Sequence, residues 1–150
     1  MRTRVNDALK VAIKEQDKVR SATLRLIMAA VKDRDIAARS DDNHEGVSDA
    51  EILDILSKMV RQRNESAVTY EEAGRPELAE RERAEIAIIE EFLPAQLSED
   101  DVRAAVSAMI TSLEAQSFKD MGRVMAALKA DYAGEMDFGQ ASAIAKELLS

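Results

Sequence analysis

The chain has 150 residues, of which five are glycine, two are proline and none is cysteine. Aromatic residues make up only 3% of it and tryptophan is absent, whereas strands favour aromatic and β-branched side chains. This composition predicts an all-α protein. The lack of cysteine excludes disulfides, thiolate nucleophiles and cysteine-based zinc sites.

The formal net charge of −8 is unevenly distributed. Residues 1–39 carry ten Lys and Arg against five Asp and Glu, and the later parts of the chain are acidic. Binding to a polyanion requires local cationic density, so we expect any contact with nucleic acid to involve this first segment. No apolar run approaches the roughly 20 residues that span a bilayer, and the first residues do not form a signal core. We therefore expect a soluble, cytoplasmic protein without a membrane partner.

Apolar residues at helical spacing open the chain. One face of a short helix is formed by Val5, Ala8, Leu9, Ala12 and Ile13. Asp17 then offers an N-cap for a longer helix. The apolar run of this second helix consists of Val19, Ala22, Thr23, Leu26, Ile27 and Ala30. We expect it to end near Arg39, because the polar cluster at residues 40–47 predicts a loop.

A capping-box pattern marks the next helix. Ser48 and Glu51 stand three residues apart, directly before an apolar run, and predict a helix start. The helix is expected to reach Ala73, because Gly74 can adopt the left-handed cap conformation and Pro76 can open another helix. That following helix is predicted over residues 77–92.

A proline interrupts the helical pattern in the stretch EFLPAQLSEDD, residues 91–101. Pro94 predicts the end of the preceding helix, Ser98 caps the next one, and Leu97 is placed to pack on Val102 as a hydrophobic staple. Three short apolar stripes follow and predict a small bundle. We interpret residues 1–93 as a helical hairpin domain, 94–98 as a linker and 99–150 as a three- to four-helix bundle. The predicted interdomain joint consists of Leu93, Pro94, Leu97 and Ser98.

Few residues offer catalytic chemistry. His44 is the sole histidine and lies in a polar loop, which favours an exposed bystander over a metal ligand or proton carrier. The loop carboxylates of Asp41, Asp42 and Glu45 leave a magnesium site open, but solvated clusters of this kind are more common. No glycine-rich phosphate loop, serine elbow or Ser-Lys signature occurs. We therefore predict no catalytic residue, no metal and no cofactor.

Two cationic motifs remain as sharper candidates. The first is Arg61-Gln62-Arg63, followed by Ser66. The second is the stretch from Lys119 to Met125, which contains Gly122 one turn into a predicted helix. A helical glycine costs about 1 kcal/mol relative to alanine, so it indicates a close approach of another backbone or a ligand. Close helix packing is the favoured explanation.

Five groups of residues, taken in order, resemble the GatB/YqeY family. They are Asp17-Lys18-Val19-Arg20 with Thr23-Leu24-Arg25; Arg61-Gln62-Arg63 with Ser66; Ala73-Gly74-Arg75 with Leu78-Ala79 and Glu82; Phe92-Leu93-Pro94-Ala95-Gln96-Leu97; and Asp120-Met121-Gly122-Arg123-Val124-Met125. More narrowly, the whole chain resembles a stand-alone YqeY-like protein. The resemblance implies a helical hairpin followed by a small helical bundle.

The resemblance also implies a relationship to the tail domain of GatB, a component of the glutamine-dependent tRNA amidotransferase. That tail helps hold the outer corner of the tRNA, while other parts of the enzyme perform the chemistry. An accessory module that binds tRNA is therefore expected, under a family label of carbon-nitrogen ligase activity with glutamine as amido-N-donor. The candidate RNA- or partner-binding residues are Arg20, Arg25, Arg61, Arg63, Lys119, Arg123 and Lys129. A protein-protein interaction module that does not contact RNA is the alternative, and amidotransfer by the chain itself is a third possibility.

Overall fold

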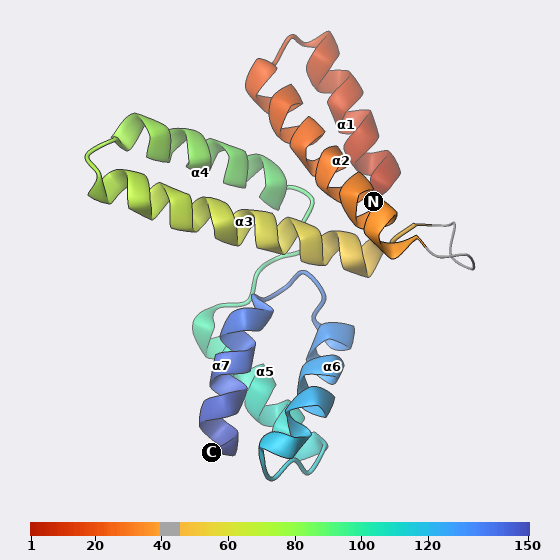
Figure 1. The fold of residues 1–150 in the computed structure, drawn as a ribbon, viewed down its shortest axis with the longest axis vertical. Helices are drawn as coiled ribbons and strands as arrows, with labels where there is room; N and C mark the ends of the chain where they lie inside the picture. Colours follow the sequence, from red (N-terminus) through yellow and green to blue (C-terminus); the bar gives the residue numbers. More distant parts are fainter. Residues whose placement is uncertain (40–45) are drawn as a thin grey trace. The chain divides into compact units, whose positions relative to one another are not determined.

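The structure, a computed structural model, describes residues 1–39 and 46–150. Every regular element in these ranges is a helix, which confirms the predicted all-α class (Figure 1). Contacts divide the chain into two compact units, residues 1–93 and residues 94–150, which we call the first and second units. Among the described residues, no helix is long and apolar enough to cross a bilayer.

The first unit contains four helices, labelled in Figure 1 as α1 (Arg2–Lys14), α2 (Lys18–Ala38), α3 (Asp49–Glu72) and α4 (Pro76–Glu90). Helix α1 packs along α2, and α3 packs along α4, so two helical hairpins are present where the sequence analysis named one. Helix α2 also contacts both α3 and α4 and joins the two hairpins. The buried centre of this unit includes Leu24, Ile27, Ile52, Leu56 and Ile89.

The predicted helix starts of the first unit are confirmed. The Asp17 carboxylate accepts the Arg20 backbone N–H at 3.0 Å, and Ser48 and Glu51 form a complete capping box. Gly74 follows the end of α3 with a φ of 73°, and Pro76 is the first residue of α4. These signals act within a few residues of one another, which is why the sequence alone is sufficient to locate them.

The end of α4 differs from the prediction. The helix stops at Glu90, before the proline that was expected to end it. The N–H groups of Glu91, Phe92 and Leu93 donate to carbonyls three residues back, so the last turn is tighter than an α-helix. Arg4 of α1 donates to the Glu91 carbonyl at 2.7 Å, and its guanidinium lies 5.1 Å from the centre of the buried Phe92 ring. A tertiary contact with α1 therefore accompanies this termination.

The second unit is a three-helix bundle of α5 (Glu99–Ser112), α6 (Met121–Asp131) and α7 (Phe138–Leu149), with a short 3-10 helix at Phe118–Asp120 (Figure 1). Each of the three helices packs against the other two. The three predicted apolar stripes form the inner faces of this bundle, except that Leu148, assigned to the third stripe, is exposed and Leu149 is buried. Its fully buried core includes Val102, Val106, Val124, Leu128 and Ala145.

Residues before α5 are bonded to the second unit. The Leu97 N–H donates to the Glu135 carbonyl at 2.9 Å, and the Gln96 side-chain amide donates to the Gly134 carbonyl at 2.6 Å. The Leu97 side chain is half-buried against the core of the bundle, and the Ser98 hydroxyl caps α5 by accepting the Asp101 N–H at 3.1 Å. Of the predicted joint residues, Leu93 is half-buried and Pro94 is exposed.

Candidate interaction surface

The part of the chain that the structure describes contains no cluster of metal-binding side chains. Residues 1–39 and 46–150 contain no group of three His, Cys, Asp or Glu side chains that could hold a metal ion. His44 and the loop carboxylates of Asp41, Asp42 and Glu45 lie outside the described residues.

Three of the predicted binding cations are already engaged within the protein. Arg20 forms an ion pair with Glu91, and Arg63 Nε lies 2.9 Å from Glu85 Oε2 between α3 and α4. Arg63 also donates to the Met59 carbonyl. Arg123 donates to the Asp120 carboxylate at 3.0 Å and to the Leu113 carbonyl. The Arg63 side chain is only 15% exposed, so its main role is to hold α3 against α4.

The other predicted cations differ in their availability. The side chains of Arg25, Lys119 and Lys129 are exposed and make no hydrogen bond or ion pair with any other described residue. Arg61 is exposed on α3 and has an interaction of its own. Arg25 and Arg61 belong to the first unit, and Lys119 and Lys129 belong to the second.

Gly122 does not mark a close approach. It is exposed near the start of α6, and a Cβ atom added there would meet nothing within 4 Å. The expected packing contact is therefore wrong, and the structure offers no physical reason for glycine at this position. Asp120 instead organises this turn, because its carboxylate accepts the backbone N–H groups of Gln116 and Ser117. These bonds, together with Arg123, lower the pKa of Asp120.

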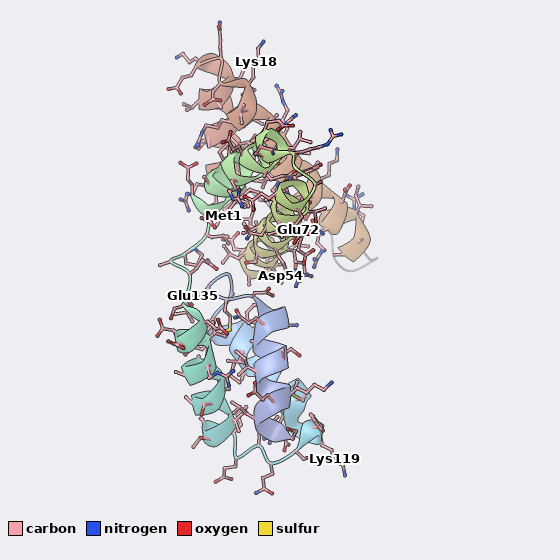
Figure 2. The ribbon with its side chains drawn as sticks, turned by 90° about the vertical axis from the view of Figure 1, so that its left-hand side faces the viewer. Met1, Lys18, Asp54, Glu72, Lys119 and Glu135 are labelled. Carbon is pink, nitrogen blue, oxygen red and sulfur yellow. The ribbon has the colours of Figure 1, made fainter. Side chains whose placement is uncertain are left out.

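Arg25 belongs to a larger exposed surface that the sequence analysis did not identify. Along α2, ten residues face the solvent, and we call them the α2 stripe. They are Lys18, Val19, Ala22, Arg25, Leu26, Ala29, Lys32, Asp33, Ile36 and Ala37. At about 1.5 Å per residue, the stripe is about 29 Å long. Figure 2 shows Lys18 at the end of the α1–α2 hairpin, where the stripe begins.

Large apolar side chains lie open to water in the α2 stripe. Val19 is 53% exposed, Leu26 is 46% exposed and Ile36 is 57% exposed. The apolar run predicted for this helix is thus divided between two faces. Of its predicted members, Thr23 and Ile27 are buried and Ala30 is half-buried, whereas Val19, Ala22 and Leu26 are exposed. Leu24 and Val31, which the prediction left out, are buried as well. Ile13 on α1, assigned by pattern to the apolar face, is likewise 49% exposed.

The cations of the α2 stripe are unpaired within the described chain. Lys18, Arg25 and Lys32 recur every seven residues, and none of their side chains makes a hydrogen bond or ion pair with another described residue. The exposed side chains of Lys10 and Lys14 on α1 likewise make no hydrogen bond or ion pair with another described residue. Most other cations of the first unit, such as Arg2 and Arg83, are paired with carboxylates. The unpaired positive charge of this unit is therefore concentrated on the α1–α2 hairpin.

On the side opposite the α2 stripe, helix α2 packs against α1, α3 and α4. On the inward side, the Ser21 and Thr23 hydroxyls are satisfied by carbonyls of the preceding turn. At the far end, Asp35 accepts hydrogen bonds from Arg2 and from the Val47 backbone. The Arg2 bond and then the Val47 bond lower the pKa of Asp35 to about 2. The stripe is thus the solvent-facing side of a helix whose other side is packed in the first unit.

The sequence profile of the Yqey-like protein family matches residues 2–149. Among curated relatives, Altered inheritance of mitochondria protein 41, mitochondrial, from Lachancea thermotolerans is 33% identical over 109 residues, covering 71% of this chain and 56% of the relative. The protein of the same name from Kluyveromyces lactis is 30% identical over 108 residues, with coverage of 71% and 56%. That from Meyerozyma guilliermondii is 34% identical over 85 residues, with coverage of 57% and 42%.

These relatives correct one expectation. Their names describe mitochondrial proteins, which contradicts the cytoplasmic location expected from the sequence. The lack of a membrane span and of a signal core had suggested that location, but neither property distinguishes one aqueous compartment from another. The chain spans about half the length of the curated relatives it matches.

Proposed function

Because this chain belongs to the YqeY-like protein family over residues 2–149, we propose that it is an accessory binding module acting in or beside tRNA-dependent amidation. It has no catalytic step of its own. The observation that carries this proposal is the exposed α2 stripe, whose cationic side chains have no partner among the described residues.

We propose tRNA as the first ligand. Its support is the resemblance to the amidotransferase tail together with unpaired cations on both units, outside the α2 stripe as well as within it. Those outside the stripe include Lys10 and Lys14 on α1, and Lys119 and Lys129 in the second unit. Lysines without a carboxylate partner can neutralise phosphates at no cost in lost ion pairs, and each phosphate contact releases counterions.

Fluorescence anisotropy with labelled tRNA tests this ligand. Binding is expected to weaken steeply between about 50 mM and about 200 mM salt. The double variants Lys10→Glu/Lys14→Glu and Lys119→Glu/Lys129→Glu remove unpaired cations from one unit each. At least one of them should weaken binding about tenfold, because reversing two phosphate-facing charges removes two counterion-releasing contacts.

A matched variant controls for net charge. Lys58→Glu/Arg103→Glu changes the charge equally but alters cations that are already paired with Asp54 and Glu147, so it should have a much smaller effect. If all three variants weakened binding equally, tRNA would be responding to the net charge of the protein and not to a specific site. Wild-type binding no stronger than that of an unrelated acidic protein would end the tRNA proposal.

A protein partner is the second candidate, and the apolar part of the α2 stripe favours it specifically. Val19, Leu26 and Ile36 each leave about half of their surface in water. Phosphate binding gains nothing from such residues, whereas a protein partner would bury them.

A further inference from the structure

We infer that the α2 stripe is the docking site for an acidic amphipathic helix of a partner protein. The inference rests on the binding role proposed above and assigns one surface and one class of partner to it. Its basis is the spacing, shape and charge of the ten exposed residues of α2.

The spacing in the α2 stripe is that of a helix-packing seam. Exposed residues occur at positions 19, 22, 26, 29, 33 and 36, which are separated alternately by three and four residues. An average separation of 3.5 residues keeps one face of a helix turned continuously toward a second helix. Because the opposite face of α2 is buried in the first unit, this seam has no partner among the described residues of that unit.

The shape of the seam permits close approach. At about 100° per residue, the ten positions cover an arc of about 140° around α2. Ala22 and Ala29 lie near the middle of this arc, with Val19 and Leu26 along one edge and the cations along the other. Small central residues let a second backbone come near, while the larger aliphatic groups at the edge provide the apolar area to be buried.

The charged residues of the α2 stripe indicate which charges the partner helix carries. Lys18, Arg25 and Lys32 form a row along one edge of the seam, at the spacing of flanking charges in paired helices. An incoming helix that places carboxylates at seven-residue intervals would face all three of them. Asp33 is the one acidic member of the stripe, and it favours a basic residue at the corresponding end of the partner.

Two other occupants fit the α2 stripe less well. If two copies of α2 paired antiparallel, the cation rows would face each other, and a parallel pair would provide no carboxylates opposite them. RNA would satisfy the cations but would leave the aliphatic edge in water, and the stripe has no aromatic side chain on which a base could stack. An acidic amphipathic helix would pair its carboxylates with the cationic edge and bury the aliphatic edge under its apolar face.

Photo-crosslinking of the full chain, in cells that produce it, tests the inference. Benzoylphenylalanine replaces Val19 at the edge of the stripe or, as a control, Val68 on α3; these residues are 53% and 50% exposed. The expected product at position 19, absent at position 68, contains a partner segment that is helical and acidic with carboxylates seven residues apart. Products containing nucleic acid, a second copy of this chain or a segment without such carboxylates would overturn the inference.

The crosslinked segment, made as a labelled peptide, is then titrated with variants. Lys18→Ala/Arg25→Ala/Lys32→Ala should weaken its binding about tenfold, because three facing ion pairs are lost. Leu26→Ser should weaken it by a similar factor, about tenfold, through lost apolar burial. The matched variant Lys10→Ala/Lys14→Ala/Lys58→Ala should change it less than about twofold, because these lysines lie outside the stripe.

The outcomes separate this inference from the binding role on which it rests. Thermal unfolding by circular dichroism should be unchanged in the stripe variants, whose altered side chains are all exposed. If a partner binds equally well to every stripe variant, the binding role survives and the α2 assignment fails. If neither position crosslinks and tRNA does not bind, both fail.

Discussion

At the scale of single residues, Asp35 of α2 bonds both to α1 and to the segment before α3. Arg2 Nη1 donates to its carboxylate at 2.7 Å, and the Val47 N–H donates at 2.9 Å. Gly46 is adjacent, with a φ of 86°, and a Cβ atom there would lie 2.8 Å from Asp35 Oδ1 and 2.9 Å from Arg2 Nη2. Glycine at position 46 therefore permits both the left-handed backbone and the close approach of this ion pair.

The depressed pKa of Asp35 predicts a pH-dependent stability. Its pKa is about 2 in the folded chain against an ordinary value of 3.8, so the charged form stabilises the fold above about pH 4. That contribution is lost as pH falls from about 4 to about 2. Asp35→Asn should therefore lower the melting temperature at neutral pH, and the difference from wild type should shrink toward pH 2. Thermal unfolding followed by circular dichroism measures it.

Asp33→Asn is the matched control, because Asp33 is exposed on the same helix and makes no ion pair with a described residue. Its melting temperature should follow wild type at every pH. A difference between Asp35→Asn and wild type that stays constant from neutral pH down to pH 2 would show that the charge of Asp35 does not stabilise the fold.

At the scale of elements, local signals were sufficient for the helix starts and insufficient for the helix faces. Ser48, Asp17 and Ser98 were predicted as caps because a cap depends on residues three or four positions away. The α2 stripe was not predicted, because apolar residues occur around much of α2 and only the packing of other helices decides which are covered. The sequence does contain a pattern that could have revealed the stripe. From Val19 to Ala29, apolar residues are separated alternately by three and four positions, and a cation occurs at every seventh residue beside them.

The capping box of α3 gives a direct test at this scale. Ser48→Ala leaves the Glu51 N–H without its side-chain acceptor and should destabilise the first unit by about 1 kcal/mol. Ser48→Asp supplies another acceptor and should retain most of the stability. Urea denaturation followed by circular dichroism distinguishes them. Equal stability of Ser48→Ala and wild type would mean that the box seen at this terminus contributes nothing.

At the scale of the whole molecule, each of the two units has its own hydrophobic core. The residues just before α5 are stabilised by contacts with the second unit. The sequence analysis assigned residues 94–98 to a linker. Gln96 and Leu97, however, bond to Gly134 and Glu135, which lie about 40 positions further along the chain. These acceptors lie in the turn before α7, and no local pattern indicates which amides they bind. Such a contact is a product of tertiary folding and could not be read from the sequence.

Two acetylated peptides test this attachment. Residues 94–150 should fold as an isolated helical bundle, and residues 98–150 should be less stable although both keep the Ser98 cap. The shorter peptide lacks the Leu97 and Gln96 hydrogen bonds and the half-buried Leu97 side chain, a loss of about 2 kcal/mol. Thermal unfolding compares them. Identical melting temperatures would show that residues 94–97 are only a linker.

The contact between Arg4 and Glu91 has a consequence for synthesis. It joins residues 87 positions apart, and with the stacking of Arg4 on Phe92 it closes the first unit across nearly its whole length. Because loops of this size close slowly and a nascent chain emerges from its N-terminus, α1 cannot complete its contacts until α4 has left the ribosome. The Arg4 contacts with Glu91 and Phe92 therefore form only after about residue 92 has emerged, whereas α1 and α2 can pack against each other as soon as α2 is out.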